Sequence, residues 1–207
     1  PYAETHKADT PLSFYAATKK ANEAMAHSYA HLFGLPITMF RFFTVYGPWG
    51  RPDMALFRFV RAIRAGDPID VYNHGRMRRD FTYVDDLVEA VARLVDAVPP
   101  AVDHRSGRAV PGDSLSPVAP WRVVNLGASE PVELSAFIAA IEAALGMSAV
   151  KRMLPMQPGD VPATWADTTL LHALVGDVPA TPLSDGIARF VDWYGERYEP
   201  LAAEAAG

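Results

Sequence analysis

Apolar and polar residues form two kinds of segment along this chain, and each kind predicts a different element. Strong helix formers occupy 13–33, with Gly34 and Pro36 just beyond, as is typical of a helix and its end. The nearly continuous apolar run at 37–43 is typical of a buried parallel strand. We predict further helices at 54–65, 85–97, 133–145, 168–174 and 183–197, and further strands at 69–72, 79–83, 122–126 and 150–154. Strands that alternate with helices indicate an α/β fold.

Individual residues indicate where these segments begin and end. Asp53 can cap the helix over 54–65, and Gly66 can end it. Asp85 is expected to begin the next helix, on which five apolar side chains share one stripe: Leu87, Val88, Val91, Leu94 and Val95. The segment 99–120 is rich in Pro, Gly, Ser and Asp, so we predict a surface loop there.

Composition narrows the classes of partner. Half of the 207 residues are hydrophobic, which is enough for a sizeable core. No window approaches the roughly 20 apolar residues of a membrane span. The net charge of −5 argues against a nucleic-acid surface. We therefore expect neither a membrane nor a nucleic acid as a partner. The absence of cysteine excludes disulfides and fits a reducing compartment, so we expect a cytoplasmic protein.

Histidine spacing gives little support for a metal site. His27 and His31 are four residues apart on the first predicted helix and could hold a metal ion, but such a pair is more often solvated. We predict no metal.

Tyr15 and Lys19 are also four residues apart on that helix, so their side chains share one face. A lysine ammonium beside a phenol favours the phenolate, which can take a proton from a sugar or alcohol hydroxyl. Lys20 is one position further and points away. The spacing is common, and by itself it is weak evidence for catalysis.

Three further motifs follow in order: Leu35-Pro36-Ile37-Thr38-Met39-Phe40-Arg41-Phe42-Phe43-Thr44-Val45-Tyr46-Gly47-Pro48, Arg51-Pro52-Asp53-Met54-Ala55 and Met77-Arg78-Arg79-Asp80-Phe81-Thr82-Tyr83-Val84-Asp85-Asp86. Together with the Tyr/Lys pair they resemble the extended short-chain dehydrogenase/reductase family. The chain is most similar to its NAD-dependent nucleotide-sugar epimerases, and among these to the UDP-glucuronate 4-epimerases. Several ordered motifs are far more specific than any one of them.

The resemblance implies a division of the chain. Residues 1–66 would be the C-terminal part of a doubly wound Rossmann sheet that binds NAD. Residues 67–207 would be a smaller mixed α/β lobe for the UDP-sugar, interleaved with the last Rossmann strand and helix at about 79–97 and 122–127. The Gly-rich turn that holds the pyrophosphate is not in this sequence. We therefore expect the chain to be a C-terminal portion that is inactive alone.

The resemblance also assigns roles around the cofactor. Tyr15 would be the base at the sugar 4-hydroxyl while hydride leaves C4 for NAD, and Lys19 would bond the nicotinamide ribose. Ser13 is too close to Tyr15 to be the family's third catalytic group. The backbone of Phe42 and Phe43 would touch the cofactor.

Other residues are assigned to the UDP-sugar. Thr44 would contact the sugar, although it could be an ordinary turn hydroxyl. Arg51 would bind a uronate carboxylate through two hydrogen bonds, or could instead pair with Asp53. Arg79, rather than Arg78, would contact the diphosphate.

At the nucleoside, Tyr72 would stack on uracil, although it could be a core residue. Asp160, in Gln157-Pro158-Gly159-Asp160, would meet the ribose. Asp80 and Asn125-Leu126-Gly127 are expected to be structural, and Arg41, inside a strand, must find partners.

The predicted activity is NAD-dependent epimerisation of UDP-glucuronate to UDP-galacturonate through a 4-keto intermediate, in a homodimer. A UDP-glucuronate decarboxylase and a neutral UDP-hexose 4-epimerase are the alternative enzymes. A non-catalytic nucleotide-sugar-binding fragment is the alternative of another class.

Overall fold

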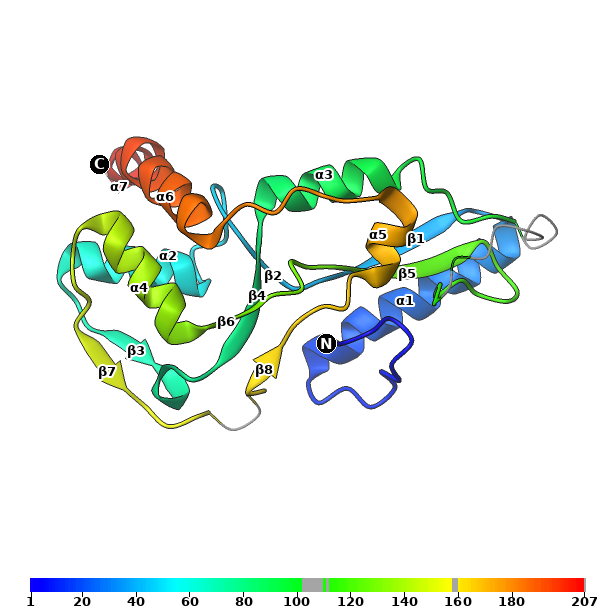
Figure 1. Cartoon of the computed structure of the whole chain (residues 1–207), viewed down its shortest axis with the longest axis horizontal. Helices are drawn as coiled ribbons and strands as arrows, with labels where there is room; N and C mark the ends of the chain where they lie inside the picture. Colours follow the sequence, from blue (N-terminus) through cyan, green and yellow to red (C-terminus); the bar gives the residue numbers. More distant parts are fainter. Residues whose placement is uncertain (102–109, 111, 158–159, 207) are drawn as a thin grey trace.

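The computed structural model describes residues 1–101, 110, 112–157 and 160–206. The molecule is elongated, and its two halves lie end to end (Figure 1). The α-helices of this part are α1 (Phe14–Phe33), α2 (Ala55–Ala65), α3 (Val84–Leu94), α4 (Leu134–Leu145), α5 (Thr169–Val175), α6 (Leu183–Trp193) and α7 (Glu199–Ala206). The strands are β1 (Ile37–Phe42), β2 (Thr44–Tyr46), β3 (Ile69–Val71), β4 (Arg78–Tyr83), β5 (Trp121–Leu126), β6 (Pro131–Glu133), β7 (Lys151–Met153) and β8 (Ala163–Thr164). The predicted α/β class is confirmed.

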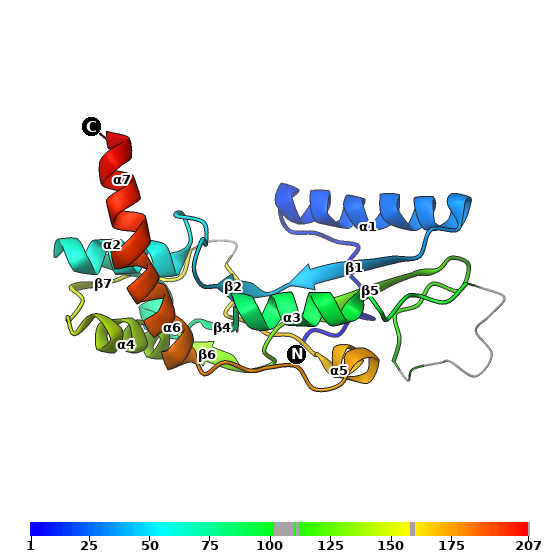
Figure 2. The ribbon, with the colours of Figure 1, turned by 90° about the horizontal axis from the view of Figure 1, so that it is seen from above.

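The first half is built on the parallel pair β1 and β5, in which Ile37 lies opposite Trp121 and Phe42 opposite Leu126. Figure 2 shows α1 on one face of this pair and α3 on the other. Val124 and Leu126 of β5 pack with Leu94 of α3 and with α5 in one buried cluster. Because the two strands are parallel, their carboxyl ends meet at one edge, which is where ligands bind in α/β sheets.

The predicted strand at 37–43 is confirmed as β1, and β2 was not predicted. The chain changes sheet between Phe42 and Thr44. The Phe43 N–H still donates to the Leu126 carbonyl at 3.1 Å. Thr44 then begins β2, which is parallel to β4. β6 is antiparallel to β4 and β8 is parallel to it. Thr44 therefore lies where the two halves of the molecule join.

The second half has its own core. The helices α2, α4 and α6 surround a buried aromatic group that includes Phe57, Phe137 and Phe190. Phe81 stacks on Phe137 with ring centroids 4.0 Å apart. Helix α2 thus packs with the second half, whereas we placed the domain boundary after residue 66. That boundary stays a prediction about the whole protein.

Two predictions about the helices are wrong. Asp53 does not cap α2, whose N-cap is Met54 without a side-chain bond, because the Asp53 carboxylate is bound to Arg51. Helix α3 ends at Leu94, and Val88 and Val95 of the expected stripe are 59% and 71% exposed. The buried position between them is Ala90.

The strand predicted at 69–72 ends at Val71, and Tyr72 begins a 3₁₀ turn (Tyr72–Gly75). Asn73 and His74 have positive φ in this turn. Helix α6 is also shorter than the predicted 183–197, because a π-helical turn (Tyr194–Tyr198) follows it.

The described part of the predicted surface loop at 99–120 contains no helix or strand, but some of its residues are buried. Residues 102–109 and 111 lie outside the described residues. Beyond them, Ser116 and Ala119 are buried. His27 contacts the Ser116 hydroxyl at 2.7 Å, and His31 contacts the Val118 carbonyl at 2.9 Å. These histidines join α1 to the segment that precedes β5.

The Asp80 carboxylate joins three segments at the junction of the two halves. It is completely buried. It accepts hydrogen bonds from the N–H groups of Ala128, Ser129 and Ala166 at 2.7, 3.0 and 3.0 Å. A Cβ at Gly127 would come within 2.7 Å of the same carboxylate. The structural roles expected for Asp80 and for the turn at Gly127 agree with these contacts.

Candidate active site

Tyr15 and Lys19 lie together on the first turns of α1. Ser13 caps this helix by accepting the Ala16 N–H at 3.1 Å. The Lys19 ammonium is 5.2 Å from the centroid of the Tyr15 ring, and Tyr15 is 67% exposed. Lys20 instead reaches Glu23 at 3.0 Å. The pair therefore has the shared face that the spacing predicts, and its phenol is open to a ligand.

Arg41 finds the partners that a charge inside a strand requires. It makes two bonds to the Glu23 carboxylate, at 2.8 and 2.9 Å, and a third to the Glu4 carbonyl at 3.1 Å. Burial acts to raise the pKa of Glu23, but the bonds from Arg41 and Lys20 outweigh it and hold that pKa below its ordinary value. Arg41 thereby fixes α1, and with it the Tyr15–Lys19 pair, against β1.

A cleft of about 300 Å³ brings together four of the five residues that we assigned to the UDP-sugar. They are Thr44, Tyr72, Arg79 and Asp160. They come from β2, from the 3₁₀ turn, from β4 and from the segment before β8. The fifth, Arg51, lines a smaller hollow that shares Thr44 and Phe81 with this cleft.

Arg79 and Arg78 have the different directions that strand alternation predicts. Arg79 lines the cleft, and one of its terminal nitrogens donates to the carbonyls of Arg78 and Val161 at 2.9 and 2.8 Å. Arg78 pairs with Glu133 at 3.0 Å. The carbonyl bonds hold the Arg79 guanidinium at the cleft and leave its other N–H groups for an anion.

Strand β3 presents Asp70 to the cleft while its neighbours Ile69 and Val71 are buried. Arg152 of the adjacent strand binds the Asp70 carboxylate at 2.5 Å, and this bond holds the pKa of Asp70 below its ordinary value. Tyr72 follows at the end of the strand and lines the cleft rather than the core.

Arg51 lies on a tight loop after β2 and is bound to Asp53. Its Nε donates to the Asp53 carboxylate at 3.1 Å, and its side chain is 72% exposed. Within the loop Gly47 has φ 141° and Trp49 has φ 61°, and the Trp49 ring packs on Trp193. The bond to Asp53 raises the pKa of Arg51, and the nearby Tyr15 hydroxyl adds a smaller effect in the same direction.

Phe42 and Phe43 line a hollow of about 350 Å³ next to Arg41 and Asn125, at the carboxyl ends of β1 and β5. The structure does not bring this hollow into the 300 Å³ cleft, with which it shares no lining residue in the described chain.

Several cleft residues were missed by the sequence analysis. Met54, Ala55, Arg58 and Phe59 line the cleft from the first turns of α2. Met54 and Arg58 share one helix face because they are four residues apart, but no signal in the sequence shows that this face lines the cleft.

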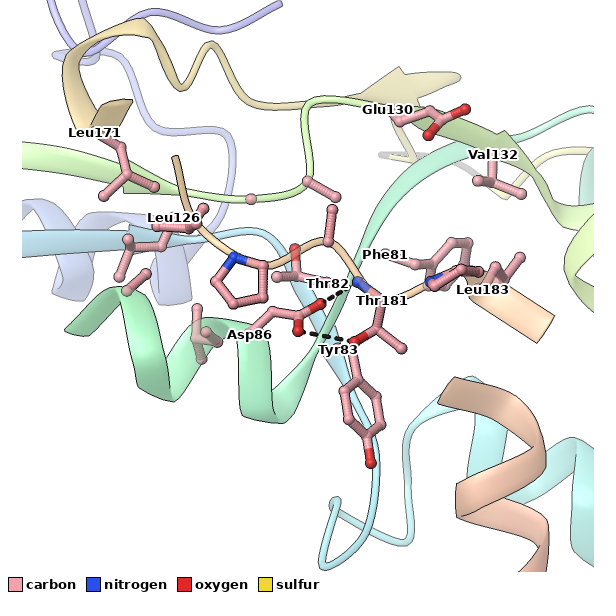
Figure 3. Close-up of a pocket in the computed structure, with 18 of the residues that line it drawn as sticks. Phe81, Thr82, Tyr83, Asp86, Leu126, Glu130, Val132, Leu171, Thr181 and Leu183 are labelled. Atoms are coloured by element: carbon pink, nitrogen blue, oxygen red, sulfur yellow. Dashed lines mark hydrogen bonds between the residues drawn. The ribbon is translucent and has the colours of Figure 1, made fainter. Parts of the chain in front are cut away.

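A second cavity of about 380 Å³ has no predicted site residue among its described lining (Figure 3). In it, the Asp86 carboxylate of α3 accepts bonds from the Thr181 N–H and hydroxyl at 2.6 and 2.8 Å. These bonds hold the segment between α5 and α6 over the junction of the two halves of the molecule. We therefore assign a structural role to Asp86.

The described residues contain no group of three or more His, Asp or Glu side chains placed to hold a metal ion. They also contain no helix with the length and apolarity needed to cross a bilayer.

The chain is similar to known proteins along nearly its whole length. The NAD dependent epimerase/dehydratase family matches residues 1–104. A probable UDP-glucuronate 4-epimerase of Rhizobium meliloti is 57% identical over 198 residues, which are 96% of this chain and 58% of the relative. Protein CapI of Staphylococcus aureus is 52% identical over 96% of this chain and 59% of its own length. The chain thus spans less than two thirds of these curated relatives.

Among solved structures, the UDP-glucuronic acid 4-epimerase of Bacillus cereus in complex with UDP-glucuronic acid and NAD is similar to this structure. It has a TM-score of 0.74 and 30% identity, over 94% of this chain and 58% of that one.

Proposed function

We propose that this chain, which belongs to the NAD dependent epimerase/dehydratase family, acts in a protein that interconverts UDP-glucuronate and UDP-galacturonate at C4 with NAD as cofactor. The observation that carries the proposal is the cleft in which Thr44, Tyr72, Arg79 and Asp160 meet. The names of the relative at 57% identity and of the similar B. cereus structure support it.

The described residues suit the nicotinamide end of NAD. The Tyr15–Lys19 face is open, and Phe42 and Phe43 line a hollow at the carboxyl edge of the first sheet. NAD, when bound, supplies the acceptor and donor of hydride at C4. We assign Lys19 to its ribose and the backbone of Phe42 and Phe43 to its nicotinamide.

Tyr15 moves the proton of the sugar 4-hydroxyl. Its phenolate accepts this proton as C4 is oxidised to a ketone. It returns the proton to the oxygen at C4 after the sugar has rotated in the site. The Lys19 ammonium, 5.2 Å from the ring centroid, stabilises the phenolate by its charge.

The cleft holds the rest of the substrate. Arg79 neutralises the diphosphate with its free N–H groups, and Tyr72 packs on the uracil. Asp160 accepts hydrogen bonds from the ribose hydroxyls, and Thr44 contacts the sugar. Holding the substrate at the UDP end leaves the sugar free to present either face at C4.

Arg51 recognises the carboxylate of the sugar, which must replace Asp53 as its partner. The same Arg51–Asp53 pair favours the alternative of a neutral UDP-hexose 4-epimerase. If the pair never opens, no side chain in this loop is free for a uronate.

The proposal is tested by incubating the complete protein with UDP-glucuronate, and separately with UDP-glucose, and identifying the products by NMR and mass spectrometry. We expect UDP-galacturonate from the first reaction. A UDP-pentose would identify a decarboxylase, and product from UDP-glucose alone would identify the neutral-sugar enzyme. No product from either sugar would refute an epimerase.

The role of Tyr15 as the catalytic base is tested by the variant Tyr15→Phe. This variant should have a kcat lower by about 10²–10⁴ and an unchanged affinity for UDP. Tyr29→Phe is the matched control, because Tyr29 is exposed on the same helix outside the predicted site. Equal losses in the two variants would overturn the role of Tyr15.

We further propose that the protein is a cytoplasmic homodimer. Helix α1 supports a partner surface, because Met25, Leu32 and Phe33 are exposed along it. Light scattering of the complete protein tests the dimer.

A further inference from the structure

Arg58 is a cation of the cleft without a partner of its own. It lies in the second turn of α2, where its N–H donates to the Met54 carbonyl at 3.0 Å. Within the described part of the chain its guanidinium has no hydrogen bond or ion pair. Many other arginines are paired with a carboxylate: Arg51, Arg64, Arg78, Arg93 and Arg152. An unpaired guanidinium on a cleft wall is available to a ligand.

The cleft has two ends, and Arg58 belongs to one of them. Thr44, Met54, Ala55 and Phe81 also line the smaller hollow that holds Arg51, so they mark the sugar end. The remaining lining residues mark the other end: Arg58, Phe59, Asp70, Tyr72, Met77, Arg79, Leu134 and Asp160.

The charge of Arg58 acts on two carboxylates: it adds to the lowering of the pKa of Asp53, the partner of Arg51, and of the pKa of Asp70 at the second end. The pKa of Asp70 is held low first by the bond from Arg152, and the charge of Arg58 adds to the effect. Arg58 and Asp70 come from α2 and β3, which the Gly66 turn joins. Arg58 therefore faces the strand that leads directly into Tyr72.

Four apolar or aromatic residues, Phe59, Tyr72, Met77 and Leu134, contribute to the walls of this end beside its four charged residues. Such walls suit a flat, uncharged ring better than a phosphate. A guanidinium is planar, so it can lie against the face of a base and can also donate to a base carbonyl. Arg79 is already placed for the diphosphate.

We propose that Arg58 binds the nucleoside end of the substrate by packing its guanidinium on the pyrimidine base. This inference rests on the proposed function. The charge stays partly in water at the mouth of the cleft, because Arg58 is exposed. The base is then enclosed between the apolar walls and the guanidinium.

The experiment uses the complete protein and three probes: UDP, UMP and inorganic pyrophosphate. Calorimetry measures the Kd of each for the unaltered protein, for Arg58→Ala and for Arg61→Ala. Arg61 is the matched control, because it is exposed on the same helix and does not line the cleft.

We expect Arg58→Ala to bind UDP and UMP each about tenfold more weakly, as for a moderate stacking contact. The affinity for pyrophosphate and all affinities of Arg61→Ala should not change. Arg58→Lys should recover little of the loss, because an ammonium is not planar. Equal melting temperatures of the variants would show that folding is not the cause.

Other outcomes would overturn the role of Arg58. A larger loss for UDP than for UMP, or weaker pyrophosphate binding, would make Arg58 a phosphate contact. Unchanged affinities in Arg58→Ala would remove it from the site. If the unaltered protein binds no UDP, the proposed function fails as well, so the two failures are distinguishable.

Discussion

The Asp80 carboxylate should be one of the most sensitive positions for folding. In Asp80→Ala the N–H groups of Ala128, Ser129 and Ala166 lose their acceptor. An unsatisfied buried donor costs about 1–3 kcal/mol, so three of them cost about 3–9 kcal/mol. Because a domain is stable by only about 5–15 kcal/mol, we expect Asp80→Ala to be largely unfolded.

Asp80→Asn keeps the shape of the side chain but lowers the number of hydrogen bonds that it can accept. Its amide oxygen can face Ser129 and Ala166 while its NH₂ group donates to the Thr82 hydroxyl, which now lies 3.3 Å from the carboxylate. Only the Ala128 N–H is then left without an acceptor. The expected loss is about 1–3 kcal/mol, well below that of Asp80→Ala.

Urea unfolding, followed by circular dichroism, measures both losses. Arg78→Ala is the control: it breaks an exposed ion pair with Glu133 and should cost at most about 1 kcal/mol. The reasoning is refuted if Asp80→Ala costs no more than Arg78→Ala, or if Asp80→Asn costs more than Asp80→Ala.

Three further predictions concern other sites. Arg51→Ala should lower kcat/KM for UDP-glucuronate far more than for UDP-glucose, because a neutral sugar has no carboxylate to bind; an unchanged ratio would contradict this. Gly127→Ala should destabilise the protein by about 1–3 kcal/mol in urea, because its Cβ would meet Ala166 at 2.6 Å and the Asp80 carboxylate at 2.7 Å. The folded-state pKa of Glu23 lies below its ordinary 4.5, so the stability it contributes is present above that value and is lost as the pH falls through the lowered pKa. Glu23→Gln should therefore flatten the acid side of the stability–pH curve.

Local signals predicted most of the elements. Gly34 and Gly66 mark helix ends in the structure as the sequence indicated, and Ser13, which we placed inside the first helix, caps it. A capping hydroxyl and a glycine in the left-handed region act within one turn of the helix, so neighbouring residues contain the information.

The errors have tertiary causes. Strand β2 was missed after the correctly predicted strand at 37–43, because it leaves the β1–β5 pair and pairs with β4, which is not near in sequence. Asp53 is a good N-cap by type, but its carboxylate has a stronger partner in Arg51. Val88 is exposed and Ala90 is buried, because the direction of α3 over the sheet decides which face is covered.

The candidate site, too, could be predicted from the sequence only where its residues belong to a motif. The family motifs pointed to Thr44, Tyr72, Arg79 and Asp160, and the fold brings these residues into one cleft. Arg58 belongs to no quoted motif, and nothing in its local sequence separates it from Arg61. Only the packing of α2 beside β3 shows that one of these two arginines lines the cleft.

Arg51 and Arg58 line two neighbouring hollows that share lining residues, and they differ in one respect that bears on the proposed substrate choice. Arg51 has Asp53 as a partner in the structure, so a sugar carboxylate must compete with an existing ion pair. Arg58 has no hydrogen bond or ion pair among the described residues, so its N–H groups are available to a nucleotide. Binding at the nucleoside end is therefore favourable before the Arg51 pair opens, and a ligand held there presents its sugar to Arg51 at high local concentration. Selectivity for a uronate then depends on the cost of opening the Arg51–Asp53 pair, which only a sugar with its own carboxylate can offset.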